Sequence, residues 1–495
     1  MTVMAAVDLG AQSGRVATGR FDGSCLELTE AHRFPNEPIE ERGRLRWDFD
    51  RLSDESLDGL RAAARDCEID SVGVDSWAID FGLLDSNGRL IANPVHYRDH
   101  RRAEAASELY RRIPPRELYG RTGIQLLPIN TACELIAMAG DSDPALEDAE
   151  RLLMIPDLLH HRLCGSVTTE LTNATTTQCF DPFTGDWATD VLERAELPAR
   201  LFPEVVPPAS VLGPVGSDAA NETGLTSARV IASATHDTAS AVAAVPFRRP
   251  GSAFLSVGTW SLVGVEVHAP VVTDETFAAN LTNEGGVAGT FRLLRNVTGL
   301  WLLHECRRRF AEVGRGYTFE QLGALAEDAV PLRSLIDPDD PSFAEPGDMP
   351  KRIAEFCRAT GQPVPTEPGD VARCIVESLA LKHAETIDLL RGAAGAEPTE
   401  LHIVGGGARN ALLCTATADA AGLPVLAGPE EATLIGNLLV QAMALGELSS
   451  LAELREVVRA SFDQTVYEPV PSHGWQEARA RFAGLRSDAN VGVGA

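Results

Sequence analysis

The chain has 495 residues, a length at which two domains of roughly 200–250 residues each are expected. Hydrophobic residues make up 44% and charged residues 23% of the sequence, a composition typical of a soluble globular protein. The formal net charge of −28 argues against nucleic acid and anionic membrane surfaces as partners, because both are bound by basic patches.

Nine cysteines are scattered through the sequence without a C-x-x-C pair. This pattern favours reduced thiols in a cytoplasmic enzyme over a disulfide framework or a zinc site. The first residues lack the basic region of a signal peptide, and no apolar run approaches the roughly 18 residues of a membrane span. We therefore expect a cytoplasmic protein without a membrane partner.

Residues 4–19 contain an apolar strand, a turn of small residues and a second strand, which together predict a hairpin. Gly10 and Gly14 would let the backbone amides of residues 11–15 approach an anion closely. Asp8, at the end of the first strand, could hold Mg²⁺ through water. An ordinary tight turn, in which Asp8 accepts hydrogen bonds from the turn amides, is an equal alternative.

A strand predicted at residues 69–75 is followed by Trp77 and Asp80. An aromatic face beside a carboxylate suits a sugar or another polyol, but a core tryptophan with a turn aspartate explains this segment equally well. Residues 172–178 are unusually rich in hydroxyl side chains, and we interpret them as a solvated loop rather than as the wall of a site.

An apolar run at residues 230–234 predicts a buried strand, and His236, Asp237 and Thr238 follow it closely. A carboxylate at the end of a core strand could take a proton from a substrate hydroxyl. On this segment alone, however, Asp237 is more simply explained as a helix cap, because Asp is among the most frequent N-cap residues.

The pattern of the N-terminal hairpin recurs at residues 253–265. Gly258 corresponds to Gly10, whereas Ser256 stands where the first hairpin has Asp8. A hairpin of this kind at the head of each half indicates a repeated architecture with two phosphate-facing turns.

Two strands of the second half also deliver candidate residues. A strand predicted at 289–295 leads to Asn296, and one at 401–404 leads to Gly405-Gly-Gly407 and a helix. Such glycines let a phosphate or a flat ring lie against bare backbone at a helix N-terminus. A nicotinamide dehydrogenase is disfavoured, because the G-x-G-x-x-G spacing of its dinucleotide fold is absent.

Three of these stretches resemble the two phosphate motifs and the adenosine motif of the FGGY carbohydrate kinases, in the actin/hexokinase/Hsp70-like superfamily. They are Asp8-Leu-Gly-Ala-Gln-Ser-Gly-Arg15, Gly258-Thr-Trp-Ser261 and Gly405-Gly-Gly-Ala-Arg-Asn410. Further stretches, spread over almost the whole chain, resemble the members of that family that phosphorylate L-rhamnulose. They are residues 32–36, 75–81, 172–178, 236–241, 283–286 and 299–303.

The resemblance implies an α/β protein of two actin-like (ribonuclease H-like) domains, each with a mixed sheet flanked by helices. The domains would be residues 1–245 and 246–495, with ATP and sugar in the cleft between them. The implied reaction is ATP-dependent phosphorylation of L-rhamnulose at its 1-hydroxyl, giving L-rhamnulose 1-phosphate and ADP during L-rhamnose breakdown, with Mg²⁺ as cofactor.

The resemblance also assigns roles to residues. Asp237 would be the general base, which reverses the preference for a helix cap, and Asp8 the carboxylate on the Mg²⁺ side. The residues implied to hold the sugar are Ala78, through its backbone, His236, Asp237, Thr238 and Asn296. Those implied to hold ATP are Ala11, Gln12, Ser13, Gly14, Arg15, Thr259, His304 and Gly406.

The chain departs from the family at two of these positions. The family commonly has Gly where this chain has Ala78, whose methyl group would narrow the sugar pocket, and Gln where this chain has His304. The alternatives are therefore a kinase of the same family for another ketose or a deoxy-sugar, or a non-catalytic sugar-binding protein on the same fold. The presence of Asp8 and Asp237 disfavours the binding protein, because binding alone needs no base.

Overall fold

The computed structural model describes residues 1–249 and 251–485, and the chain forms two compact units. Unit 1 comprises Met1–Pro246, Glu266–Leu293 and Ala432–Phe462. Unit 2 comprises Phe247–Val265, Leu294–Glu431 and the described residues from Asp463 onwards. The two domains expected from the sequence, 1–245 and 246–495, stay a prediction, and residues 486–495 of the second lie outside the described residues.

Unit 1 is built on a six-stranded mixed sheet whose strands neighbour one another in the order β13-β14-β6-β1-β2-β3. Their bounds are β1 (Thr2–Leu9), β2 (Ser13–Phe21), β3 (Leu26–Pro35), β6 (Ser71–Ser76), β13 (Ser210–Pro214) and β14 (Arg229–Ala232). Strand β1 pairs antiparallel with β2 and parallel with β6, and β6 pairs parallel with β14. Because seven of the eight residues of β1 are buried, this strand is a near-continuous apolar run rather than an alternating one.

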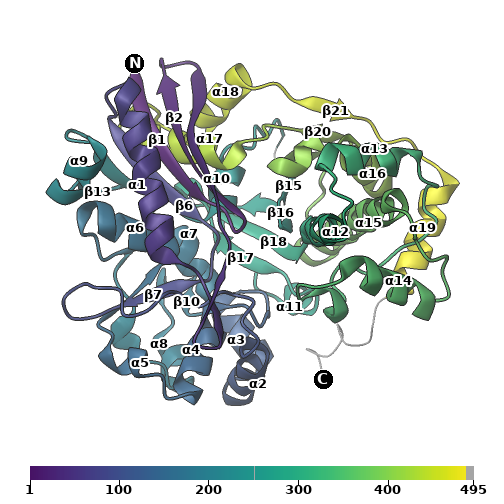
Figure 1. Ribbon diagram of the computed structural model, residues 1–495, viewed down its shortest axis with the longest axis horizontal. Helices are drawn as coiled ribbons and strands as arrows, with labels where there is room; N and C mark the ends of the chain where they lie inside the picture. The colour runs from purple at the N-terminus through teal and green to yellow at the C-terminus, as the bar shows by residue number, and fades with distance from the viewer. Residues whose placement is uncertain (250, 486–495) are drawn as a thin grey trace. The chain divides into compact units, whose positions relative to one another are not determined.

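Helix α1 (Phe49–Asp66) and helix α17 (Ala432–Ala444) pack on this sheet (Figure 1). Although α17 comes late in the sequence, it is bound to unit 1 by polar contacts with β1 and β6. Asn437 Nδ2 donates to Asp75 Oδ2 over 2.6 Å, and Gln441 Nε2 donates to the carbonyl oxygen of Ala5 over 3.0 Å. A Cβ at Gly436 would overlap the backbone of Ser240 in helix α10 (Asp237–Ala243), so the two helices meet at a bare glycine.

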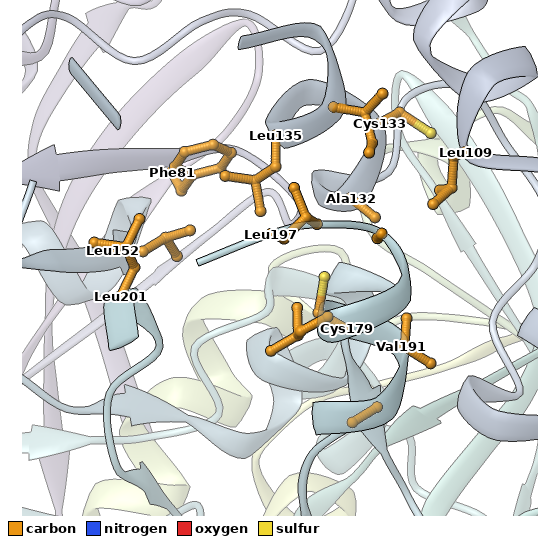
Figure 2. Close-up of a cluster of buried hydrophobic side chains, with 14 of the residues drawn as sticks. Phe81, Leu109, Ala132, Cys133, Leu135, Leu152, Cys179, Val191, Leu197 and Leu201 are labelled. Carbon is orange, nitrogen blue, oxygen red and sulfur yellow. The ribbon is translucent and has the colours of Figure 1, made fainter. Parts of the chain in front are cut away.

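The residues between β6 and β13 in the sequence form a second part of unit 1, which has its own apolar core. Figure 2 shows this core, in which Phe81, Leu109, Leu135 and Leu152 converge from different elements. The elements that supply the core include β7 (Phe81–Leu84), α2 (Arg102–Arg112), α4 (Thr131–Gly140), β8 (Arg151–Met154) and α8 (Thr189–Arg194).

The remaining elements of unit 1 are short. Helices are α3 (Pro115–Thr122), α5 (Pro144–Asp148), α6 (Ile155–Cys164), α7 (Leu171–Ala174), α9 (Ser217–Thr223), α11 (Asp274–Ala278) and α18 (Leu451–Ser461). Strands are β4 (Ile39–Glu41), β5 (Arg44–Arg46), β9 (Thr169–Glu170), β10 (Phe180–Asp181), β11 (Asp186–Trp187), β12 (Val205–Val206) and β17 (Thr282–Gly285).

Unit 2 repeats the sheet of unit 1. Its strands neighbour one another in the order β18-β16-β15-β19-β20-β21, with bounds β15 (Ala253–Val257), β16 (Trp260–Val267), β18 (Phe291–Thr298), β19 (Leu401–Val404), β20 (Val425–Ala427) and β21 (Thr465–Tyr467). As in unit 1, the first strand pairs antiparallel with the second, and two parallel neighbours and an antiparallel edge strand follow on its other side. The repeat inferred from the two hairpins is therefore confirmed.

Helices complete unit 2: α12 (Trp301–Glu312), α13 (Phe319–Asp328), α14 (Met349–Ala359), α15 (Pro368–Ala394), α16 (Ala411–Ala421) and α19 (His473–Ala483). The longest, α15, begins with Pro368 in its first turn and ends at Gly395 in the left-handed conformation, the usual stop signal for a helix. All nine cysteines are outside disulfides, as predicted. Within residues 1–249 and 251–485, no helix is both long enough and apolar enough to cross a lipid bilayer.

Candidate active site

The first of the two turns that are predicted to face phosphate connects β1 to β2. The amide of Gly10 donates to the carbonyl oxygen of Ser13 over 3.1 Å, and a Cβ at Gly10 would lie 2.8 Å from that oxygen, so the tight turn requires glycine. A Cβ at Gly14 would overlap the ring of Phe34 on β3, which explains this glycine by packing. Between the two glycines, residues 11–13 are half-exposed and accessible to a ligand.

Asp8 lies at the carboxyl end of β1, where it forms an ion pair with Arg15 on the opposite strand. Asp75 stands beside it in the parallel register between β1 and β6. Burial raises the pKa of Asp75 well above its usual value, and the charges of Asp8 and Asp237 add to this effect, whereas the amide of Asn437 opposes it. Three carboxyl groups therefore meet at one edge of the unit 1 sheet, of which the sequence identified only Asp8 and Asp237.

Asp237 is the first residue of α10, and His236 occupies the N-cap position without a capping hydrogen bond from its side chain. The Asp237 side chain nevertheless accepts from its neighbour: Oδ1 takes hydrogen bonds from the backbone amide and, over 3.0 Å, from the hydroxyl of Thr238. Burial, reinforced by the charge of Asp8, raises the pKa of Asp237 to about 7. Its side chain is still 32% exposed, so a substrate can reach it.

His236 connects Asp237 to a buried ion pair. Its Nε2 lies 3.3 Å from Asp237 Oδ1, and its Nδ1 lies 3.1 Å from the NH2 group of Arg292 and 3.4 Å from Glu284 Oε2. Burial and the positive charge of Arg292 hold the pKa of His236 well below its usual value, so the ring is neutral. Sequence reasoning missed Arg292 entirely, and Glu284 entered only as part of the stretch 283–286 that resembles the family.

The hydroxyl-rich segment 172–178 is not a solvated loop, and that interpretation is wrong. It forms α7 and a turn of 3₁₀-helix, Thr175–Thr177, and its threonine side chains are buried. The reason is Glu170, whose carboxylate accepts from the amides and hydroxyls of both Thr172 and Thr235. These bonds fix the residue directly before His236.

Trp77 and Asp80 follow the structural alternative rather than the sugar-binding one. The Asp80 carboxylate is fully buried and accepts from the indole nitrogens of Trp47 and Trp77 over 2.7 and 3.1 Å. It also pairs with Arg102 over 2.8 Å. Because these partners surround the buried Asp80 carboxylate, it is not accessible to a ligand. Ala78, in the turn between them, stays half-buried.

Ala78 follows β6 by two residues, and β6 runs up to the segment that precedes α10. Ser76 and His236 form a parallel β-bridge, and the amide of Ser76 donates to the carbonyl oxygen of Thr235 over 2.9 Å. The structure thus brings four of the five predicted sugar residues, Ala78 and residues 236–238, to one edge of unit 1. The fifth, Asn296, is half-buried on β18 in unit 2.

The second turn that is predicted to face phosphate, Gly258-Thr259, lies between β15 and β16 in unit 2. The amide of Leu300 donates to Gly258 O over 2.9 Å, and the amide of Gly299 donates to Thr259 O over 3.1 Å. A Cβ at Gly299 would lie 2.5 Å from the carbonyl carbon of Trp260, so this close support of the turn requires glycine.

The glycines after β19 lie at the same sheet edge, because β15 and β19 are parallel neighbours. Gly405 adopts a positive φ of 79°, and a Cβ at Gly407 would overlap the side chain of Val257. Gly406, by contrast, is exposed and a Cβ there would meet nothing within 4 Å. Two of these three glycines therefore serve the fold, and Gly406 presents open backbone.

His304 sits in the first turn of α12, and its amide donates to the carbonyl oxygen of Leu300 over 2.9 Å. Its ring packs edge-on against Phe319 at a centroid distance of 4.6 Å. Burial and the charge of Arg307 lower the pKa of His304 to about 4, so the ring is neutral near pH 7. Thr259, His304 and Gly406 thus all belong to unit 2, whereas residues 11–15 belong to unit 1.

The carboxyl groups around Asp8 suit a magnesium ion that is shared with phosphate. Among the described residues, no group of three or more His, Cys, Asp or Glu side chains is arranged to hold a metal ion by itself. Mg²⁺ typically uses one or two carboxylates and completes its shell with water and phosphate oxygens. Asp8 provides such a carboxylate, and the like charges that raise the pKa of Asp75 and Asp237 favour a cation nearby.

Comparison with known proteins identifies the family. Residues 3–244 match the N-terminal domain, and residues 253–445 the C-terminal domain, of the FGGY family of carbohydrate kinases. A rhamnulokinase of Bacteroides thetaiotaomicron is 43% identical over 96% of this chain and 98% of its own, and one of Oceanobacillus iheyensis is 38% identical over 95% and 99%. The ligand-bound xylulose kinase of Lactobacillus acidophilus has the same fold, with a TM-score of 0.79 at 16% identity over 98% of this chain and 97% of its own. The chain belongs to the FGGY family of carbohydrate kinases.

Proposed function

We propose that this protein transfers the γ-phosphoryl group of ATP to the 1-hydroxyl of L-rhamnulose, giving L-rhamnulose 1-phosphate and ADP. The observation that carries this proposal is the identity of 43% and 38% to two rhamnulokinases over nearly the full length of each chain. The position and pKa of Asp237 supply the chemistry.

Asp237 is the general base. With a pKa of about 7, a substantial fraction of this carboxyl is ionised at neutral pH, yet it is basic enough to accept a proton. As the proton of the sugar hydroxyl passes to Asp237, the hydroxyl oxygen bonds to the γ-phosphorus and the bond to the bridging oxygen breaks, releasing ADP. Phosphoryl transfer asks a protein mainly for positioning and charge stabilisation, so one base and two ordered turns suffice.

The sugar is held by the backbone at Ala78 and by His236, Thr238 and Asn296. Ala78 provides the point of specificity, because its methyl group takes space that the family commonly leaves open. Asp8 would hold the Mg²⁺ side of the nucleotide, and the bound cation would neutralise charge that develops on the phosphates.

ATP is held without lysine. The chain contains only Lys351 and Lys382, and neither lies in a turn described above. The residues proposed to contact ATP are Ala11, Gln12, Ser13, Gly14, Arg15, Thr259, His304 and Gly406. Most of these contacts would be made by backbone amides in the turns, which suit phosphate oxygens, while the neutral His304 ring would contribute packing rather than charge.

The test is ATP-dependent ADP release over a panel of L-rhamnulose, L-fuculose, D-xylulose, L-ribulose and glycerol, with Asp237→Asn as the control. Preference for L-rhamnulose, with a loss of at least about 100-fold in the variant, supports both the substrate and the base. The second candidate function, phosphorylation of another ketose or a deoxy-sugar, is motivated by Ala78. It would be supported if a different sugar is preferred and Ala78→Gly moves the preference toward L-rhamnulose. Binding of sugar without turnover would contradict the kinase proposal.

A further inference from the structure

Arg292 is a fully buried arginine that no motif predicts. Its side chain is 0% exposed, and its guanidinium is held in one orientation by three contacts. Nε donates to the carbonyl oxygen of Gly285 over 3.0 Å, NH1 lies 3.2 Å from Glu284 Oε2, and NH2 lies 3.1 Å from His236 Nδ1. The division between the units falls within β18, after Leu293, so Arg292 and the three residues that it contacts all belong to unit 1.

The two neighbours of His236 Nδ1 require opposite protonation states of this nitrogen. Glu284 Oε2, at 3.4 Å, is an acceptor and would require a proton on Nδ1. The NH2 group of Arg292, at 3.1 Å, only donates and requires a lone pair there. The arginine is the closer of the two and makes the hydrogen bond. Glu284 Oε2 forms an ion pair with the other terminal nitrogen of the same guanidinium, NH1, over 3.2 Å.

A neutral imidazole carries one N–H, so the contact with Arg292 decides where it lies. If Nδ1 accepts from Arg292, the proton must be on Nε2, the nitrogen that lies 3.3 Å from Asp237 Oδ1. We propose that Arg292 is a positioning residue that fixes His236 in the Nε2–H tautomer, so that the ring directs a donor at Asp237 and at the substrate beside it.

The consequence concerns which group acts as the base. A donor on Nε2 stabilises the Asp237 carboxylate, and it also prevents the imidazole from accepting the substrate proton itself. With the proton on Nδ1 instead, the lone pair of Nε2 would face the carboxylate and repel it. With Arg292 in place, Asp237 and not His236 therefore acts as the base. This conclusion rests on the proposed function, whereas the tautomer of His236 is a property of the protein without substrate.

The tautomer can be observed directly by NMR of the full-length protein labelled with ¹⁵N-histidine, since protonated and unprotonated ring nitrogens differ widely in chemical shift. The protein has 11 histidines, and the variant His236→Gln identifies the signals of His236 by their disappearance. We expect the wild-type ring to be neutral, with the proton on Nε2.

Two variants of the same ion pair give a matched comparison. Arg292→Met removes the donor, so the proton should move to Nδ1 and bond to Glu284. Glu284→Gln disrupts the same ion pair but keeps Arg292, so the proton should stay on Nε2. Arg292→Lys, which keeps a charged donor, should also retain the Nε2–H form.

Kinetics provide the second readout. Arg292→Met should lower kcat/KM for the sugar about 10- to 100-fold, the range for one hydrogen bond to a charged group, with a much smaller effect in Glu284→Gln. A wild-type proton on Nδ1, or a folded Arg292→Met that keeps it on Nε2, would overturn the proposal; if Arg292→Met does not fold, the wild-type and Arg292→Lys spectra still decide it. Inactivity toward L-rhamnulose with the expected spectra would count against the proposed substrate alone.

Discussion

The rate of sugar phosphorylation should fall as the pH decreases. This fall should occur at a higher pH than is usual for a carboxylate base. Asp237 must be ionised to accept the proton, and burial beside Asp8 raises its pKa to about 7. With that pKa, about 9% of the enzyme carries the ionised base at pH 6 and about 91% at pH 8. We therefore expect kcat/KM for the sugar to rise about tenfold between these values, whereas an aspartate with the ordinary pKa of about 3.9 would give a flat profile.

The assay is ADP release from pH 5.5 to 8.5 with Mg-ATP and sugar both well below their KM, so that the free enzyme is titrated. ADP is measured after quenching so that no coupling enzyme limits the pH range. The side chain of Asp237 is 32% exposed, and bound sugar would remove that remaining water. In the complex with Mg-ATP, this desolvation and the charge of the cation near Asp8 act on the pKa of Asp237 in opposite directions.

Two other groups near Asp237, His236 and Glu170, do not account for such a limb. Burial and Arg292 hold the pKa of His236 well below its usual value. Glu170 has a pKa of about 7, but its oxygens are occupied by Thr172 and Thr235. A wild-type profile that is flat between pH 6 and 8 would refute this reasoning, and so would the same limb in the residual activity of Asp237→Asn.

Three further predictions concern the glycines after β19 and the buried carboxylates. Gly406→Ala should leave the fold intact and raise the KM for ATP, because its Cβ meets no protein atom, whereas Gly407→Ala should destabilise the protein; thermal melts and ATP titrations separate the two effects. Asp80→Asn should lower the free energy of unfolding, measured in urea, by about 3 kcal/mol. This is the low end of the range for a broken buried ion pair, because Arg102 keeps its second partner, Glu134. The KM of the folded enzyme for the sugar should not change. Burial raises the pKa of Glu170 from 4.5 to about 7, so the folded state binds the proton more tightly than the unfolded state. As the pH rises from 4.5 to 7, the wild type should therefore lose on the order of 3 kcal/mol of unfolding free energy relative to Glu170→Gln.

Local signals in the sequence were sufficient for the repeated hairpins and for several candidate residues. An apolar run followed by small residues predicts a strand and a turn wherever it occurs, and this pattern located the turns at Gly10 and Gly258 and the strand that leads to Asp237. The parallel pairing of the strands then brings Asp8 and Asp237 to one sheet edge.

The remaining part of the site depends on partners far apart in the sequence. Thr172 looks like a solvated residue because hydroxyl side chains usually mark loops, and only the buried carboxylate of Glu170 reverses that expectation. Arg292 gives no local signal, since an arginine in a strand is ordinarily exposed, and its role depends on contact with His236, 56 residues away. Asp75 is similar, because its partner Asn437 lies on a helix near the other end of the chain.

The position of helix α17 also constrains the order in which the chain can fold during synthesis. Asp75 and the amide of Asn437 that bonds to it are 362 residues apart, so at about 5–20 residues per second a ribosome needs roughly 20–70 s to make the second after the first. During that interval the groove at Gly73, which the polar side chains of α17 fill in the finished protein, stays open to water and to chaperones. The part of the unit 1 sheet that contains Asp75 is therefore covered by α17 only when most of the protein has been synthesised.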